Sequence, residues 1–349
     1  MNFIKGRKEE FINFINEITK RDKIAVITHT DLDGIASVIF LEEILNSINK
    51  KISVLKFADY KNDIIKKLLP IFKKEKISRV FILDLNIDSL ALEDFEKLKK
   101  QIPTFLVDHH PIDTRLNNFK NIIKADSFNC VTQIIYELKK AFSNSKEKDW
   151  ILVPTMISEF SYKNLENLEF MKFAHPDITE REILSSEQGK LTMILNYALI
   201  YYNDSLKKVY DLIKNRELDK LKKVYDVIDK EIIKEKKNIL EKSEHDLDKN
   251  IYFYFFKPKH RIKSLISTDL SMKYPNSTFV LVTQEGKDKC FLNVSARNQS
   301  MNKDMNLLLK KAIQGLDNAN AGGHVAAAGA RFMKKDIKKF KENLFSSSN

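Results

Sequence analysis

The sequence is poor in cysteine, proline and glycine. Its 349 residues include 2 Cys, 7 Pro and 8 Gly. Cys130 and Cys290 stand alone, so neither a disulfide framework nor a cysteine metal site is expected, and a cytoplasmic protein is the default. With 43% hydrophobic and 31% charged residues, the composition excludes a disordered chain and favours a helix-rich globular protein.

Long apolar runs are also missing. No run approaches the roughly 18 residues that a membrane span needs. The opening residues MNFIKGRKEEFINF lack the apolar centre of a signal peptide, so we expect neither secretion nor a membrane. The length exceeds that of one typical domain, which favours two domains.

Positive charge is concentrated near the C-terminus. The formal net charge is +12, and residues 251–349 alone hold 17 Lys and Arg against 7 Asp and Glu. A near-neutral segment followed by a basic one suggests a chemical domain and a domain that holds a polyanion. A general bias toward lysine would give the same excess, so charge alone does not decide the question.

Apolar patterning predicts an α/β fold. In the first part of the chain, strand-like segments alternate with helix-like ones, which predicts a parallel sheet with flanking helices. The strands are expected at 23–28, 52–57, 79–85, 104–107 and 121–125, and the helices at 34–48, 63–72 and 90–100. Residues 131–142 and much of 150–245 have helical spacing. Strands return at 251–256, 278–284 and 289–296, before a helix at 305–313. We therefore expect an N-terminal parallel-sheet domain (1–200), a helical connector (201–249) and a smaller C-terminal α/β domain (250–349).

Acidic and imidazole side chains follow three of the predicted strands. His29, Asp31 and Asp33 come directly after the first strand, in the segment HTDLDG. If that segment stays extended, the three side chains face the same way and suit a divalent metal such as Mn²⁺. The alternative is an Asp-Gly turn with aspartates that cap a helix.

Two further strands end in the same kind of residue. Asp84 closes RVFILDL, and Asp108, His109 and His110 follow the next strand. Ligand sites of open α/β sheets form at the carboxyl ends of the strands. Three such clusters in one sheet therefore favour a metal site over isolated helix caps.

These motifs resemble those of the DHH phosphoesterases. HTDLDG, the Asp of FILDL and VDHHP match the first three DHH motifs in order and spacing. AGGHVAAAG at 321–329 looks like the GGH motif of the DHHA1 domain, and Ser295-Ala296-Arg297 resembles its upstream element. The resemblance covers about residues 20–160 and 250–345. It implies a DHH catalytic domain followed by a DHHA1 substrate-binding domain.

The resemblance also implies roles for individual residues. His29, Asp31 and Asp84 would hold one metal, and Asp33, Asp84 and His109 a second, so that Asp84 bridges them. His110 would face the scissile phosphate, and Asp108 would orient the histidines. The substrate-binding residues would be Arg297, Gly322, Gly323 and His324.

One family motif is altered in this sequence. The family's fourth motif is usually an Asp that completes the second metal site, but residues 151–160 contain none. Glu159 is the candidate in its place, and Asp126 is the alternative.

The aromatic run at 252–256 could stack nucleobases, although strand spacing makes most of it core.

The expected activity is metal-dependent phosphodiester hydrolysis. An exonuclease that releases mononucleotides from single-stranded DNA or RNA, or from short oligonucleotides, agrees with the basic C-terminal segment. Two divalent ions are implied, Mn²⁺ first and Mg²⁺ or Co²⁺ as options. The alternatives are a hydrolase of a small phosphorylated molecule (a cyclic dinucleotide, a phosphorylated adenosine nucleotide or polyphosphate) and a non-catalytic RecJ-like scaffold. The resemblance admits a replication or repair protein as partner and leaves the oligomeric state open, a dimer included.

Overall fold

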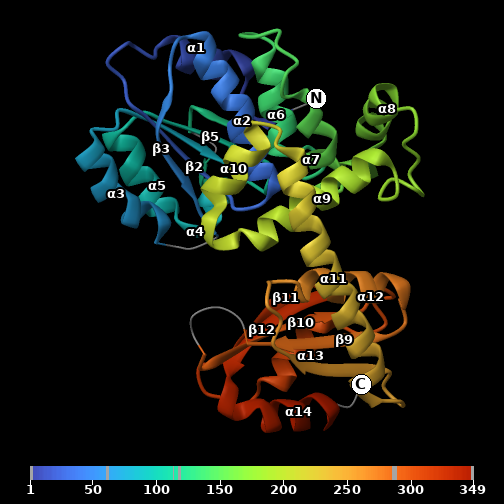
Figure 1. Ribbon diagram of the computed structural model, residues 1–349. Helices are drawn as coiled ribbons and strands as arrows, with labels where there is room; N and C mark the ends of the chain where they lie inside the picture. Colours follow the sequence, from blue (N-terminus) through green and yellow to red (C-terminus); the bar gives the residue numbers. More distant parts are fainter. Residues whose placement is uncertain (1–2, 60–62, 113, 117–118, 285–288, 347–349) are drawn as a thin grey trace. The chain divides into compact units, whose positions relative to one another are not determined.

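The computed structural model describes residues 3–59, 63–112, 114–116, 119–284 and 289–346 (Figure 1). The chain forms two compact units, Met1–Lys222 and Lys223–Asn349, and each is described by itself. Among the described residues, no helix combines the length and the apolar character that crossing a membrane would require.

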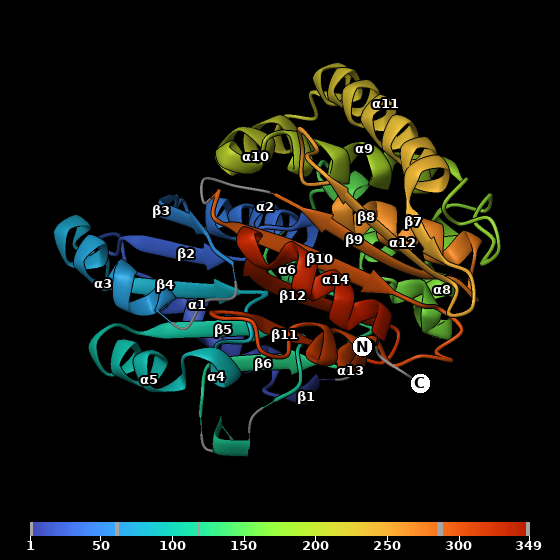
Figure 2. The same ribbon diagram turned by 90° about the horizontal axis from the view of Figure 1, so that it is seen from below.

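The first unit is built on a six-stranded sheet. Its order is β1-β6-β5-β4-β2-β3, and all neighbours run parallel except β1 and β6 (Figure 2). The strands are β1 (Phe3–Lys5), β2 (Ile24–Thr28), β3 (Ile52–Phe57), β4 (Arg79–Leu83), β5 (Thr104–Asp108) and β6 (Ile122–Ala125). The five predicted strands are confirmed, but β4 ends at Leu83, so Asp84 lies beyond it. The short β1 was not predicted, because three residues carry no periodic signal.

Helices cover both faces of this sheet. On one face, α3 (Ile64–Glu75) and α5 (Leu92–Gln101) pack on alternate strand residues, with α4 (Ile87–Leu90) before α5. On the other face, Phe11 and Phe14 of α1 (Lys8–Asn16) contact Phe81 and Phe105. Because both faces are covered, β2 and β5 are buried throughout, which explains their continuous apolar sequences.

Further helices complete the first unit. Twelve residues of α2 (Leu32–Ser47) are buried, because the helix packs on the sheet and against its neighbours α6 and α7. The remaining helices are α6 (Val131–Lys139), α7 (Leu152–Ser158), α8 (Leu165–Ala174), α9 (Glu187–Tyr201) and α10 (Leu206–Lys214). The helix α11 (Leu218–Lys242) crosses the boundary between the two units without interruption.

The second unit has its own sheet, in the order β11-β12-β10-β9-β8-β7. Only the pair β8–β9 is parallel, and the helix α12 (Lys263–Lys273) connects these two strands. The strands are β7 (Glu244–Asp246), β8 (Ile251–Phe256), β9 (Thr278–Thr283), β10 (Phe291–Arg297), β11 (Asn320–Gly323) and β12 (Ala327–Met333). The helices α13 (Met305–Ala312) and α14 (Ile337–Ser346) pack on one face and complete the core.

The aromatic run on β8 is mainly structural. Ile251 and Phe253 are buried, as strand spacing predicts, and Phe256 is also buried although it lies three residues beyond Phe253. Tyr252 is stacked between His245, 3.8 Å away between ring centroids, and Phe279, 5.0 Å away. Both faces of Tyr252 are therefore already covered by rings of the same chain.

A close backbone contact connects β2 to α2. A Cβ atom added at Gly34 would lie 2.4 Å from the carbonyl oxygen of His29 and 2.9 Å from its backbone nitrogen. These partners are backbone atoms, which cannot rotate away. Only glycine therefore allows the first turn of α2 to approach the end of β2 so closely.

We predict that Gly34→Ala lowers the free energy of unfolding by about 1–3 kcal/mol, the usual cost of overpacking a tight site. Denaturant titration of the first unit's unfolding measures this change. Gly322→Ala is the control, because a Cβ there meets no atom within 4 Å. Equal stability of the Gly34 variant and the natural protein would show that this contact relaxes without cost.

Candidate metal centre

The predicted site residues meet at the carboxyl ends of β2, β4 and β5. These three strands run parallel, with β4 paired to both β2 and β5. His29, Asp84 and His109 each follow the end of one of them, so the strands bring residues far apart in sequence to one edge of the sheet. Potential ligand atoms of Asp84, His109 and His110 lie within 4.8 Å of one another, and so do those of His29, Asp31 and Asp84.

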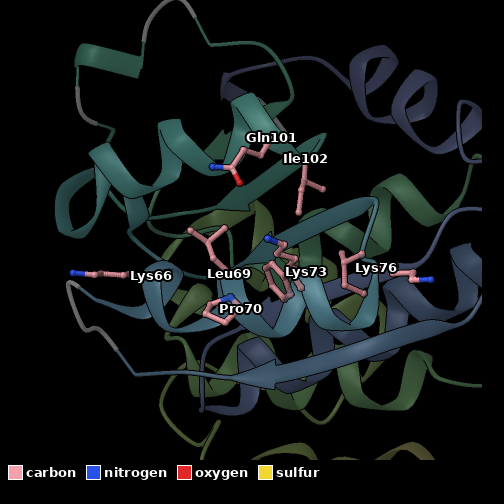
Figure 3. Close-up of a pocket in the computed structure, with 9 residues that line it drawn as sticks. Lys66, Leu69, Pro70, Lys73, Lys76, Gln101 and Ile102 are labelled. Atoms are coloured by element: carbon pink, nitrogen blue, oxygen red, sulfur yellow. The ribbon is translucent and has the colours of Figure 1, made fainter.

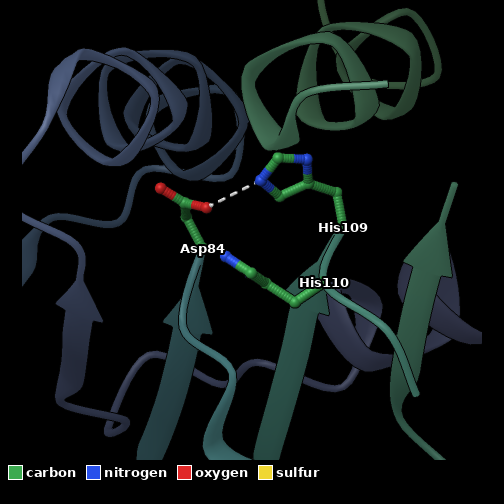
Figure 4. A group of neighbouring side chains, drawn as sticks. All are labelled: Asp84, His109 and His110. Carbon is green, nitrogen blue, oxygen red and sulfur yellow. Dashed lines mark ion pairs between the residues drawn. The ribbon is translucent and has the colours of Figure 1, made fainter. Parts of the chain in front are cut away.

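Asp84 belongs to both groups. Its Oδ1 lies 3.4 Å from His109 Nε2 (Figure 4). Its Oδ2 lies 3.6 Å from His29 Nδ1. The residue is buried and adopts a left-handed backbone conformation with φ 55°, while its N–H donates to the carbonyl of Val107. A left-handed aspartate at the end of a buried strand is strained, and such strain gathers at functional sites.

His29 and Asp31 form a close pair. His29 Nδ1 lies 2.7 Å from Asp31 Oδ2, and the other oxygen of Asp31 accepts the N–H of Gly34 at 2.9 Å. Asp31 is thus the N-cap of α2, which begins at Leu32. Of the two conformations left open for HTDLDG, the structure shows the one with a capping aspartate, because the helix starts inside this segment. Asp31 nevertheless both caps the helix and faces the centre.

Asp33 contacts the N-terminus of α6, a contact that an extended segment would not predict. Its two oxygens accept the backbone N–H groups of Val131 and Thr132, each at 2.7 Å, so the carboxylate caps α6. It also interacts electrostatically with His109 and Asp31. Asp33 therefore lies at the border of the centre, between α2 and α6. The contact with α6 spans nearly 100 residues of sequence and has no sequence signal.

Glu159 and Asp126 differ in their surroundings. Glu159 ends α7 and interacts electrostatically with Asp31, Asp33 and Asp84. The two oxygens of Asp126 accept the N–H of Phe128 and the side-chain amide of Asn129, each at 2.9 Å, within one turn. Glu159 therefore lies among the acidic groups of the centre, whereas the Asp126 carboxylate is bound within its own turn.

Asp108 contacts His110 and a lysine. His110 Nδ1 lies 2.8 Å from Asp108 Oδ1, which fixes the imidazole ring. On the other side, the ammonium of Lys124 lies 2.8 Å from Asp108 Oδ2 and 2.8 Å from both oxygens of Asp88. Sequence reasoning missed Lys124 and Asp88. The available signal was a lysine inside the otherwise apolar strand IIKA.

The charges at this edge of the sheet strongly perturb proton binding. Burial, together with the charges of Asp31 and Asp33, raises the pKa of Asp84 to about 7. Burial also raises the pKa of Glu159 well above its ordinary value, and Asp31 adds to the effect. Burial alone would lower the pKa of His29 and His109, but nearby carboxylates outweigh it and raise each pKa to about 10. These carboxylates are Asp31 and Asp84 for His29, and chiefly Asp84 and Asp33 for His109.

These features fit a divalent cation. Asp84 Oδ2 and His109 Nδ1 are buried with no hydrogen-bond partner among the described residues, which is costly for a polar atom. Carboxylates and imidazoles are donors that suit Mn²⁺. A cation between them would replace the protons that otherwise balance the acidic groups.

The predicted substrate-binding residues lie together in the second unit. Arg297 ends β10 and pairs with Ala327 of β12, and Ala327 closes a four-residue turn that begins at His324. Gly322 and Gly323 precede this turn on β11, the edge strand. The Nε of Arg297 is buried without a hydrogen-bond partner among the described residues, and burial lowers the pKa of this guanidinium.

A separate hollow of about 600 Å³ lies beside α3 and α5 (Figure 3). Apart from Gln101, its lining is apolar or basic and includes Leu69, Pro70, Lys73 and Lys76. The lining offers no carboxylate or imidazole, so this hollow supplies no ligands of the kind found around Asp84.

Comparison with solved structures places the fold among known proteins. The chain is similar to the exonuclease RecJ bound to manganese, with 12% identity, a TM-score of 0.69, and 99% of this chain and 94% of that chain covered. It is also similar to an exopolyphosphatase-related protein from Bacteroides fragilis (15%, TM-score 0.50, 97% and 95% covered). A third similar structure is CDC45 from Entamoeba histolytica (10%, TM-score 0.58, 97% of each chain). None of the curated proteins matches the sequence.

Two family descriptions match the sequence itself. The DHH family N-terminal domain matches residues 23–159, and the DHHA1 domain matches residues 249–346. The chain belongs to the DHH/DHHA1 superfamily and has its phosphoesterase fold. The resemblance drawn from the motifs is thereby confirmed, and so is the α/β fold class.

Metal binding is predicted to strengthen as pH rises. His29 and His109 carry protons at neutral pH, because their raised pKa of about 10 lies above it, and a metal ligand must release that proton. Between pH 6 and 8, we expect Mn²⁺ affinity to increase by up to tenfold per pH unit for each proton released. Calorimetry in two buffers with different ionisation enthalpies counts those protons.

The control for this measurement is His260→Gln, which removes a histidine paired with Glu231 in the second unit. This variant should release as many protons as the natural protein. An Mn²⁺ affinity that stays constant from pH 6 to 8 would contradict the assignment of both histidines as ligands.

Proposed function

We propose that this protein is a two-metal phosphodiesterase that releases mononucleotides from single-stranded DNA or RNA, or from short oligonucleotides. The observation that carries the proposal is the position of Asp84. Two groups of potential ligands, one on each side, share this single buried carboxylate. Such an arrangement suits two cations joined by one bridging residue.

Each side of Asp84 would hold one ion. His29 and Asp31 would bind the first together with Asp84. Asp33, His109 and Glu159 would complete the second. When bound, the two ions would neutralise phosphate oxygens and make water a better nucleophile.

The protein's own residues would orient the substrate. His110, fixed through its Nδ1 by Asp108, would donate from Nε2 to an oxygen of the scissile phosphate when its ring carries a proton on both nitrogens. Arg297 would bind a further phosphate with two parallel hydrogen bonds, because its planar guanidinium fits two oxygens at once. His324 and the open backbone at Gly322 would allow a strand to approach this end of the second sheet.

Exposed aromatic rings favour a nucleic acid over polyphosphate. Phe160, which directly follows Glu159, is 43% exposed, and Phe128 is 45% exposed three residues before Val131, whose N–H binds Asp33. Exposed rings beside a phosphate site can stack on nucleobases, whereas polyphosphate has nothing to stack. The basic C-terminal segment suits either anion.

A non-catalytic scaffold has less support. His29, Asp31 and His109 all lie near Asp84, and burying several carboxylates without a cation would be costly. Hydrolysis of a small phosphorylated molecule has one specific observation in its favour, the structural similarity to an exopolyphosphatase-related protein. It is therefore the second candidate.

The decisive experiment incubates the protein and Mn²⁺ with end-labelled single-stranded DNA and RNA of several lengths, blunt duplex and polyphosphate. We expect mononucleotides from single strands and much slower cleavage of duplex, because duplex is stiff. Asp84→Ala should lower kcat by more than ~10³, since it disturbs both ions at several kcal/mol each.

Asp269→Ala serves as the matched control, because Asp269 pairs with Lys236 at the surface of the second unit. Equal rates on duplex and single strands would argue against the proposed substrate. Hydrolysis of polyphosphate alone would favour the second candidate, and no hydrolysis with Mn²⁺, Mg²⁺ or Co²⁺ would favour the scaffold.

A second test concerns Arg297 and His324. Replacing either by alanine should raise KM roughly ten- to a hundredfold, because one charge-assisted contact to phosphate is lost. Metal binding should stay unchanged, since the ligands around Asp84 belong to the other unit. If His324 also acts on the transition state, kcat falls as well.

Salt dependence adds an independent measure. For a strand of ~10 nucleotides, log affinity should fall with log salt by about 0.7 per phosphate contact, and each variant should flatten the slope by about that amount. Arg331→Ala is the control, because the Arg331 guanidinium lies over the ring of Phe291 on the same sheet. Loss of metal with unchanged substrate affinity in His324→Ala would exclude a phosphate-binding role for that residue.

A further inference from the structure

A buried lysine connects three segments behind the proposed centre. The Lys124 side chain is only 1% exposed. Its ammonium lies 2.8 Å from both oxygens of Asp88 and 2.8 Å from Asp108 Oδ2, and it also donates to the carbonyls of His110 and Pro111 at 3.3 and 3.4 Å. The contact between Lys124 and Asp108 is an ion pair, but its angles do not fit a hydrogen bond.

The sheet register creates this contact. Asp108 on β5 is paired with Lys124 on β6, so their side chains are neighbours on one face. Asp88 reaches the same ammonium from α4, the short helix that follows β4. The lysine therefore joins the segments after β4 and β5, which carry Asp84 and the two adjacent histidines.

The two carboxylate oxygens of Asp108 contact different groups. Oδ2 faces Lys124, and Oδ1 lies 2.8 Å from His110 Nδ1. The position of the lysine thus fixes the rotation of the carboxylate, and the carboxylate fixes the imidazole. The carbonyl of His110 is bound to the same ammonium, so both the backbone and the ring of this residue depend on Lys124.

A buried ion pair is weak evidence for stability alone. The free-energy cost of removing a lysine and two carboxylates from water often exceeds the gain from their mutual attraction. An apolar side chain would fill an interior strand position without that cost. Stability alone therefore does not explain why this interior strand position holds a lysine.

We propose that Lys124 and Asp88 are positioning residues that act through Asp108 to hold His110 toward the scissile phosphate. The inference rests on the proposed function, because it takes from it the role of His110. Neither residue touches the substrate. Lys124 sets the carboxylate, and Asp88 holds the ammonium from the opposite side.

The protein contains a matched control. Lys139 on α6 is also buried, at 2% exposure, and pairs with Glu43 at 3.0 Å and Asp149 at 2.9 Å. These contacts join α6 to α2 and to the segment before α7, without a residue of the proposed centre. Lys139→Met therefore reproduces the loss of a buried lysine, but not the loss of the connection to His110.

The central experiment compares Lys124→Met with Lys139→Met, alone and in a His110→Ala background. Lys124→Met should lower kcat by roughly 10- to 100-fold and leave KM within about threefold, the usual scale for residues that orient a site's ligands. In the His110→Ala background it should cause no further loss, because coupled residues are not additive. Lys139→Met should lower stability but not kcat.

A second measurement does not depend on activity. In the metal-free protein, nitrogen-15 spectra of His110 should show the proton held at Nδ1, as its contact with Asp108 requires. Lys124→Met should redistribute that proton between Nδ1 and Nε2, and Lys139→Met should not. If Lys124→Met does not fold, Asp88→Asn replaces it, since the amide keeps the shape of the carboxylate and removes its charge.

The outcomes separate this inference from the proposed function. An equal loss of kcat in the natural and His110→Ala backgrounds, or an unchanged His110 spectrum in the Lys124 variant, would overturn the positioning role. So would an equal loss of kcat in Lys139→Met. If the natural protein cleaves no phosphodiester, the proposed function fails, while the spectra still decide whether Lys124 controls His110.

Discussion

Negative charge is concentrated at the carboxyl ends of β2, β4 and β5, and much of the first unit is arranged around it. Asp33 and Asp84 are buried there beside Asp31 and Glu159, and burial, with the repulsion between these carboxylates added to it, raises the pKa of Asp84 and Glu159. Without a cation, protons on two histidines and on part of the carboxylates balance this charge. A pair of divalent ions would remove that need, which links the electrostatics to the proposed chemistry.

Helix N-termini stabilise part of this negative charge. The N-terminal N–H groups of α6 bind both oxygens of Asp33, and the first turn of α2 binds Asp31. Partial positive charge at a helix N-terminus stabilises such carboxylates. The consequence is mechanical as well, because each capped aspartate fixes one helix relative to the sheet edge. The fold and the charge distribution therefore depend on the same contacts.

Sequence reasoning predicted the strands and the residues at their ends, because buried parallel strands give continuous apolar runs and the site residues follow them directly. Contacts across long sequence separations could not be predicted in the same way. The link from Asp33 to α6 and the ion pair of Lys124 with Asp88 depend on register and helix placement, which no local pattern encodes. The sequence left two conformations open for HTDLDG, and the capping turn is found because a helix begins at Leu32.

The left-handed backbone at Asp84 restricts what the position can accept. Among ordinary residues, glycine, asparagine and aspartate adopt this conformation most readily. Asparagine is the one that keeps both the shape and the backbone preference of aspartate while removing its charge. A single nucleotide change between their codons would therefore remove the carboxylate proposed to bridge two ions and keep this backbone conformation. Within this architecture, asparagine at position 84 is one single-step route from the proposed enzyme to a purely structural descendant.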